Sequence, residues 1–172
     1  MRRSNIVEEY RIDDLGAPFG VVLERSVGMV YGEHGPAPVI PDLCGLVYET
    51  TAARIRHPRR LAGADLTFVR KACEMSREDF GHAIGCDEAT IVAYENGSRA
   101  IPGVVDRLIR MRCHHMLRDK VAEGRDRFML FLDWLFEEYV HRPMYDPTEE
   151  ISFTLYYDET AGWRPGSSPT TR

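Results

Sequence analysis

Apolar side chains recur every three or four positions in the middle of the chain, between residues 62 and 112. That spacing places them on one face of a helix, as in helices that pack against a core. Four successive helices are therefore predicted in this segment. Their apolar positions are Leu66, Val69 and Cys73, then Phe80 and Ile84, then Ile91 and Tyr94, then Val105, Leu108, Ile109 and Met111.

Residues that favour helix ends lie between these patterns. Ser76, with Asp79 three positions later, resembles a capping box at the start of the second helix. Gly85 permits a sharp turn into the third helix, which we expect to begin at Asp87. The third helix is predicted to end at Asn96 and Gly97, and the fourth helix is predicted to start at Pro102.

The first part of the chain has the pattern of strands followed by a helix. Residues 19–23 and 27–31 are apolar runs, separated by the polar residues 24–26. This pattern predicts a β-hairpin or small sheet. Asp42 is a candidate cap for a helix that stops at a His-Pro pair. We expect the basic connector, residues 57–60, to be solvated, with a contact to DNA phosphates as the alternative.

The last part of the chain predicts a long helix and a strand. Residues 151–157 alternate apolar and polar side chains, which indicates a strand, and residues 165–172 read as a disordered tail. An aromatic stripe on the helix favours a core or a subunit interface, with a pocket for a small inducer as the alternative. The stripe consists of Phe128, Phe131, Trp134, Phe136 and Tyr139.

The patterns together predict an α+β protein built from three units. These are a small strand-rich N-terminal unit (1–60), a central all-α domain of four to five helices (61–115), and a C-terminal extension of a helix plus short β-strands (116–164). We expect the N-terminal unit to contact a partner or support a dimer, and the C-terminal extension to hold the dimer.

Composition restricts the class of protein. Hydrophobic residues make up 44% of the chain, the formal net charge is −5, and no third of the sequence is basic. This balance argues against tight non-specific DNA binding, which depends on neutralising phosphates. The sequence has no apolar run long enough for a membrane helix, so we expect a cytoplasmic protein without membrane contacts.

The reactive residue types do not form a recognisable catalytic or metal site. The four cysteines lack CxxC spacing, which favours reduced thiols over a disulfide framework. A metal site from Cys73, His82 and Cys86, or from the Cys-His-His run 113–115, is the alternative to ordinary packing. No activated nucleophile is evident, so we expect neither an enzyme nor a cofactor.

The segment VRKACEMSREDFGHAIGCDEATIVAYENGSRAIPGVVDRLIRM resembles the lambda-repressor-like (XRE) helix-turn-helix domain, and in particular the variant that closes MqsA (YgiT-type) antitoxins. Zinc-binding antitoxins of that family carry CxxC pairs in the N-terminal domain, whereas this chain has Cys44 alone there, so no structural zinc is expected. The shared residues are Gly63, Ala64, Phe68 to Lys71, Ser76, Gly85, Thr90, Ile91, Tyr94 to Gly97, Ile101 to Gly103, and Asp106 to Leu108.

The resemblance implies which residues meet DNA. Positions near base edges are Asp87, Glu88, Ala89, Thr90 and Ala93. Glu88 could accept a hydrogen bond from a cytosine amino group, and either alanine could touch a thymine methyl group. The alternative is that Asp87 and Glu88 only stabilise the positive end of the helix dipole.

Phosphate contacts are implied at four further positions. Arg77 begins the helix that crosses the DNA backbone, and Asn96, Ser98 and Arg99 follow the recognition helix. The alternative for these residues is solvated turn chemistry. Glu95 is expected to bond locally or to pair with Arg70 inside the domain, rather than to contact DNA.

The functional expectation is a sequence-specific transcriptional regulator of double-stranded DNA. It would act as an antitoxin-like autorepressor that binds a palindromic operator as a homodimer. The alternative is a protein-binding module that uses the helix-turn-helix scaffold to sequester a toxin or another regulator. The acidic start of the recognition helix keeps this alternative open.

Overall fold

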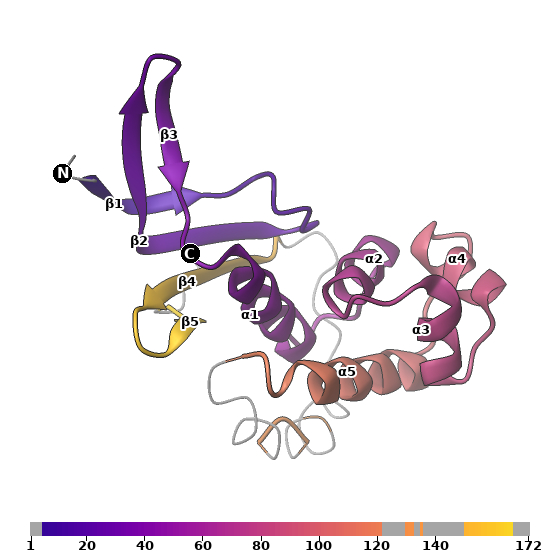
Figure 1. Cartoon of the computed structure of the whole chain (residues 1–172). Coiled ribbons are helices and arrows are strands. Elements are labelled where there is room, and N and C mark those ends of the chain that lie inside the picture. Colours follow the sequence, from indigo (N-terminus) through magenta and orange to yellow (C-terminus); the bar gives the residue numbers. More distant parts are fainter. Residues whose placement is uncertain (1–4, 122–129, 133–134, 136–149, 167–172) are drawn as a thin grey trace.

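The computed structural model describes residues 5–121, 130–132, 135 and 150–166. Strands lie at both ends of the described chain and helices lie between them (Figure 1). The strands are β1 (Asn5–Arg11), β2 (Gly20–Gly32), β3 (Gly35–Val39), β4 (Ser152–Asp158) and β5 (Gly162–Pro165). The helices are α1 (Leu43–Arg56), α2 (Gly63–Ala72), α3 (Arg77–Ile84), α4 (Glu88–Glu95) and α5 (Gly103–Leu117).

The N-terminal and C-terminal strands belong to one mixed sheet, which corrects the prediction of separate strand units. The order is β1-β2-β4-β5, with β3 also paired to β2. β4 runs parallel to the start of β2, with Leu23 opposite Leu155, and β5 is antiparallel to β4. The alternating pattern of residues 151–157 correctly indicated a strand. It could not identify the partner, because pairing over so long a separation leaves no local signal.

β2 is long enough to pair with β1, β3 and β4. Residues 20–23 pair with β4 and residues 22–29 pair with β1, while residues 28–32 pair with β3 in a hairpin that projects from the sheet (Figure 1). The polar interruption at residues 24–26 is a β-bulge in one strand, not the turn of a hairpin. Val7 lies opposite Val27 and Glu9 opposite Glu24, so β2 contains one extra residue. Ser26 in this bulge accepts a hydrogen bond of 2.7 Å from the backbone N–H of Tyr157.

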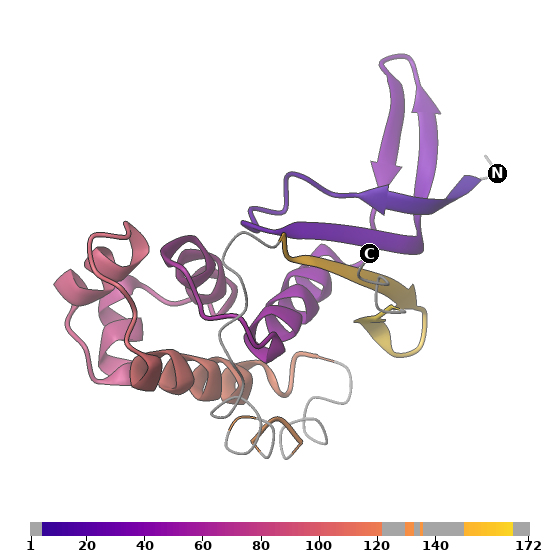
Figure 2. The same cartoon turned by 180° about the vertical axis from the view of Figure 1, so that it is seen from behind.

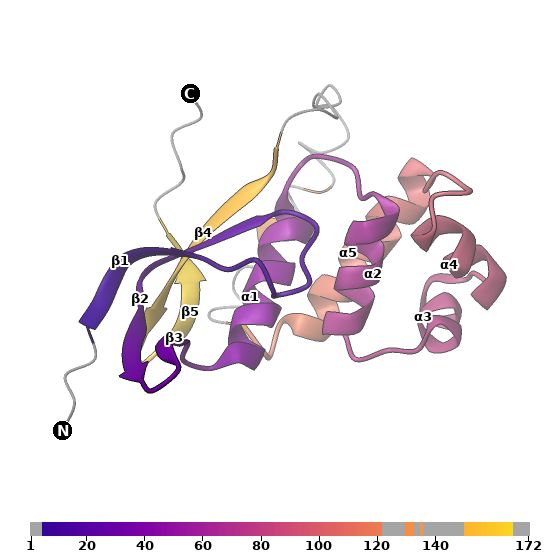
Figure 3. The same cartoon turned by 90° about the horizontal axis from the view of Figure 1, so that it is seen from above.

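The helix α1 lies between the sheet and the other helices (Figure 3). Its predicted cap is confirmed, because Asp42 Oδ1 accepts a 3.0 Å hydrogen bond from Gly45 N–H. Leu46 of α1 packs into the core of the sheet and Ile55 into the core of α2–α5. The indole N–H of Trp163 on β5 donates to the carbonyl of Asp42 at 2.9 Å. The C-terminal strands therefore also hold the start of α1.

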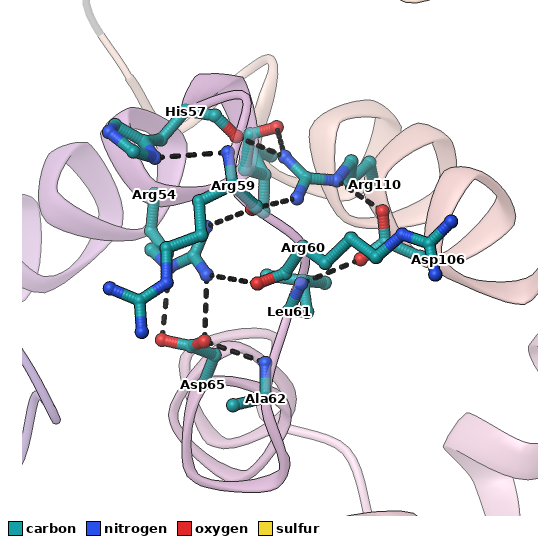
Figure 4. Close-up of polar contacts among 10 residues, drawn as sticks. Arg54, His57, Arg59, Arg60, Leu61, Ala62, Asp65, Asp106 and Arg110 are labelled. Carbon is teal, nitrogen blue, oxygen red and sulfur yellow. Dashed lines mark hydrogen bonds and ion pairs between the residues drawn. The ribbon is translucent and has the colours of Figure 1, made fainter. Parts of the chain in front are cut away.

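Two arginines with no exposed surface join α1 to the helices that follow (Figure 4). Arg54 of α1 donates to both carboxylate oxygens of Asp65 on α2, at 2.9 and 2.7 Å. Arg110 of α5 donates to Asp106 at 2.8 Å, one turn away on the same helix. Buried guanidinium groups are tolerated where carboxylates and carbonyls take up their donors.

The remaining donors of these arginines hold the basic connector, residues 57–60. Arg54 donates to the carbonyls of Arg59 and Arg60 at 3.0 and 2.9 Å. Arg110 donates to the carbonyls of His57 and Arg59 at 2.6 and 2.7 Å. Backbone carbonyls of the connector are thus bound by buried arginines, while its side chains remain half-buried or, at Arg60, exposed. The sheet, α1 and α2–α5 consequently form one body instead of separate domains (Figure 2).

Several predictions concern residues that are only partly described. Of the aromatic stripe, the described residue is Phe131, which is buried and stacks on His114 with ring centroids 4.4 Å apart. The other four stripe positions and residues 167–172 lie outside the described residues. β5 extends to Pro165, so the chain is still paired at the first residue of the predicted tail. No helix in the described part is long and apolar enough to cross a membrane.

Candidate nucleic-acid interface

The helices α3 and α4 meet at a tight turn built around two glycines. Gly85 adopts a left-handed conformation (φ 73°) that ends α3 and is costly for other residues. Gly81 lies against the turn, because a Cβ atom there would come within 2.7 Å of the carbonyl oxygen of Cys86. The N–H of Cys86 in turn donates to the Gly81 carbonyl at 2.9 Å. At the other end of α3, Ser76 Oγ accepts from Asp79 N–H at 3.0 Å, which confirms the predicted cap.

The predicted base-reading residues Asp87 and Thr90 have a structural role at the start of α4. Asp87 Oδ1 accepts a hydrogen bond of 2.7 Å from the backbone N–H of Thr90. Hydrogen bonds from the side chain and backbone of Thr90 hold the pKa of Asp87 below its ordinary value. Asp87 is therefore the ionised cap of α4. This agrees with the alternative interpretation of the sequence, in which Asp87 stabilises the start of the helix.

The outward face of α4 is more apolar than polar. Ile91 and Tyr94 are buried, whereas Glu88 and Ala89 are exposed and Ala93 is half-buried. Val92 is 37% exposed on the same outward face. The base-reading residues predicted from the sequence did not include Val92, which shares their face of α4. Its position four residues after Glu88 and three after Ala89 was the signal that could have found it.

Glu95 at the end of α4 holds two arginines. Its Oε1 accepts from Arg70 Nε at 2.7 Å, which confirms the predicted pair, and its Oε2 accepts from Arg77 Nε at 2.6 Å. Burial favours a higher pKa for Glu95, but the hydrogen bonds and charges of Arg70 and Arg77 lower it below its ordinary value. The ionised Glu95 thus holds the guanidinium group of Arg77 through its Nε atom. The side chain of Arg77 nevertheless remains 46% exposed beside α4.

The three candidate phosphate contacts after α4 lie in an exposed turn. Asn96 Oδ1 accepts from Ser98 N–H at 2.9 Å, and Ser98 Oγ donates to the carbonyl of Ala93 at 3.3 Å. Arg99 lies over the ring of Tyr94, with its guanidinium carbon 5.6 Å from the ring centroid. The side chains of Asn96 and Ser98 therefore order the turn that presents Arg99.

Exposed acids surround these cations. Glu78 and Asp79 lie in the first turn of α3, and Asp87 and Glu88 begin α4. Their carboxylates would repel phosphates and so weaken any general attraction of this surface for polyanions. A DNA complex would depend on a few well-placed contacts.

The cysteines and histidines of these helices do not form a metal centre. Among the described residues, no group of three or more His, Cys, Asp and Glu side chains could hold a metal ion. Cys73 and Cys113 are both buried in the core of α2–α5, where a hydrogen bond from the Cys113 thiol lowers the pKa of Cys73. His114 is buried, whereas its neighbour His115 is exposed.

No protein-family model matches the chain, and neither a curated protein nor a solved structure matches it. The resemblance to XRE-type antitoxins consequently rests on the residues quoted from the sequence.

Proposed function

We propose that this protein is a sequence-specific DNA-binding transcriptional regulator. It would bind a palindromic operator as a homodimer, with α4 in the major groove and α3 across the backbone. The resemblance to MqsA-type antitoxins extends this proposal to an autorepressor that responds to a protein partner such as a toxin.

The supporting observation is the exposed outward face of α4 together with two ordered arginines beside this helix. Arg77 is ion-paired with Glu95 at the C-terminal end of α4, and Arg99 of the following turn lies over the ring of Tyr94. Cations beside a helix that presents small side chains suit contacts to the phosphates that border a groove. The tight α3–α4 turn gives this arrangement a fixed geometry.

The acidic surround favours one competing function, a module that binds a basic protein partner. Glu78, Asp79, Asp87 and Glu88 are all exposed near the same helices. Such a surface would attract a cationic toxin or regulator through complementary charge.

The deciding experiment measures binding of the full chain to a duplex selected from a random pool and to its scrambled version, at two salt concentrations. We expect Arg77→Ala and Arg99→Ala to weaken both duplexes similarly and each to reduce the salt slope by about 1. Glu88→Ala should raise affinity for the scrambled duplex and reduce discrimination at one base pair by about 1 to 3 kcal/mol.

A matched control is Arg25→Ala, because Arg25 is an exposed, ion-paired arginine on β2, a strand outside α3 and α4. It should leave both affinities and the salt slope unchanged. If the parent protein binds the selected and scrambled duplexes equally at both salt concentrations, it is not a sequence-specific DNA binder.

A further inference from the structure

The centre of the outward face of α4 offers almost no hydrogen-bonding group. Ala89 and Val92 lie three residues apart on this face, and Ala93 lies beside them. Thr90 is half-buried and its N–H is bonded to Asp87, while Asn96 Oδ1 accepts from Ser98. In the first turn, Glu88 provides a free carboxylate at the edge of the face.

Val92 is not part of the buried core of the chain. The buried side of α4 is formed by Ile91 and Tyr94, which enter the helical core, whereas Val92 is 37% exposed. In the major groove, the feature that attracts an apolar side chain is the C5-methyl group of thymine. Glu88 can only accept hydrogen bonds when ionised, which suits the amino group of cytosine.

We infer that Val92 contacts the methyl group of a thymine in the operator, about two base-pair steps from the cytosine that Glu88 contacts. The inference rests on the proposed DNA-binding function and adds the chemistry of a second base. The spacing follows from geometry. Four residues of helix advance about 6 Å, compared with about 3.4 Å between successive base pairs.

The experiment replaces each thymine of the selected operator by uracil, which removes only the methyl group. For the parent protein, one such replacement should weaken binding about fourfold, the factor that corresponds to one buried methyl group. For Val92→Ala, the same replacement should have an effect of less than about 1.5-fold, because the contacting side chain is gone. The sensitive thymine should lie one to three steps from the base pair whose discrimination Glu88→Ala reduces.

The valine substitution is expected to preserve the fold, because Val92 is exposed and alanine is a better helix former. Val30→Ala provides the matched control, since Val30 is 38% exposed on β2, outside α4. This control should keep the full sensitivity to uracil. Thermal unfolding of each variant checks that the folds are comparable.

The outcomes separate this inference from the function on which it rests. If the parent protein prefers no duplex, the proposed function fails and the inference fails with it. If the parent binds its operator selectively but tolerates uracil at every thymine, the function stands and the inference is overturned. The inference is equally overturned if Val92→Ala remains as sensitive to uracil as the parent protein.

Discussion

Arg110 and Asp106 form an ion pair of 2.8 Å on α5, and neither side chain has more than 1% of its surface exposed. Asp106 also accepts a 2.9 Å hydrogen bond from the backbone N–H of Leu61, and Arg110 donates to three carbonyls between residues 55 and 59. The pair therefore connects the end of α1, the connector and the start of α2 to α5. A buried pair with this many partners orients several elements at once.

Replacing Arg110 by methionine should lower the free energy of unfolding by about 3 to 5 kcal/mol, because it leaves Asp106 buried without its cation. Arg25→Met is the control, since the Arg25–Glu8 pair has a similar length, 2.7 Å, but both side chains are more than 70% exposed. That substitution should leave the free energy of unfolding almost unchanged, because exposed ion pairs contribute little. Denaturant unfolding measures both, and equal effects would show that the buried network does not hold the helices together.

His57 should make stability depend on pH. Burial and the charges of Arg54 and Arg110 lower its pKa to about 4, below the value of about 6.5 expected in an unfolded chain. Between these values the unfolded chain binds more protons, so stability falls as the pH falls from about 7 to 4. Because the ring is partly open to water, the loss should not exceed about 2 kcal/mol.

The test for His57 combines an NMR titration of its ring with unfolding at several pH values. His57→Asn keeps an acceptor for the N–H of Arg59, which now donates to His57 Nδ1 at 3.2 Å, but cannot titrate. Its stability should change less with pH than that of the parent. A ring that titrates near pH 6.5 in the folded protein would contradict the prediction.

Gly81→Ala should destabilise the α3–α4 turn, although alanine normally favours a helix by about 0.5 to 1 kcal/mol over glycine. The new Cβ would come within 2.7 Å of the Cys86 carbonyl oxygen, so we expect a net loss of about 1 to 3 kcal/mol. His82→Ala, an exposed position of the same helix, is the control and should be nearly neutral. Thermal unfolding of both variants is the measurement, and a stabilised Gly81→Ala protein would rule out the close contact.

Leu155→Ala tests whether β4 is part of the main core. Leu155 is 1% exposed and packs with Leu23, Val27 and Trp163, so its truncation should cost about 2 to 5 kcal/mol in a single cooperative transition. Tyr156→Ala, at a more exposed neighbour, should cost less than about 1 kcal/mol. A loss confined to a separate minor transition would instead indicate an independent C-terminal unit.

The helices were predictable because their signals are local. The caps at Asp42, Ser76 and Asp87 and the left-handed Gly85 depend on residues a few positions apart, and each was read correctly. The Arg70–Glu95 pair was anticipated from the family resemblance. These features require no knowledge of the rest of the chain.

The sheet and the connector were not predictable in the same way. Whether residues 24–26 form a turn or a bulge depends on the strands beside them, and β4 lies far from β2 in sequence. The connector looked solvated because its own residues are basic and polar. Its carbonyls accept hydrogen bonds from Arg54 and Arg110. The charge of these two arginines suggested that they lie on the surface, whereas both are buried.

The parallel pairing of β2 with β4 also sets an order in time during synthesis. Leu155 is added to the growing chain 155 − 23 = 132 residues after Leu23, so the two strands cannot pair before that point. At about 5 to 20 residues per second, the edge of β2 stays open for roughly 7 to 26 seconds. All of α1 to α5 is made within that interval. Until then the nascent chain carries an apolar, unpaired strand edge, which is a template for pairing with other chains.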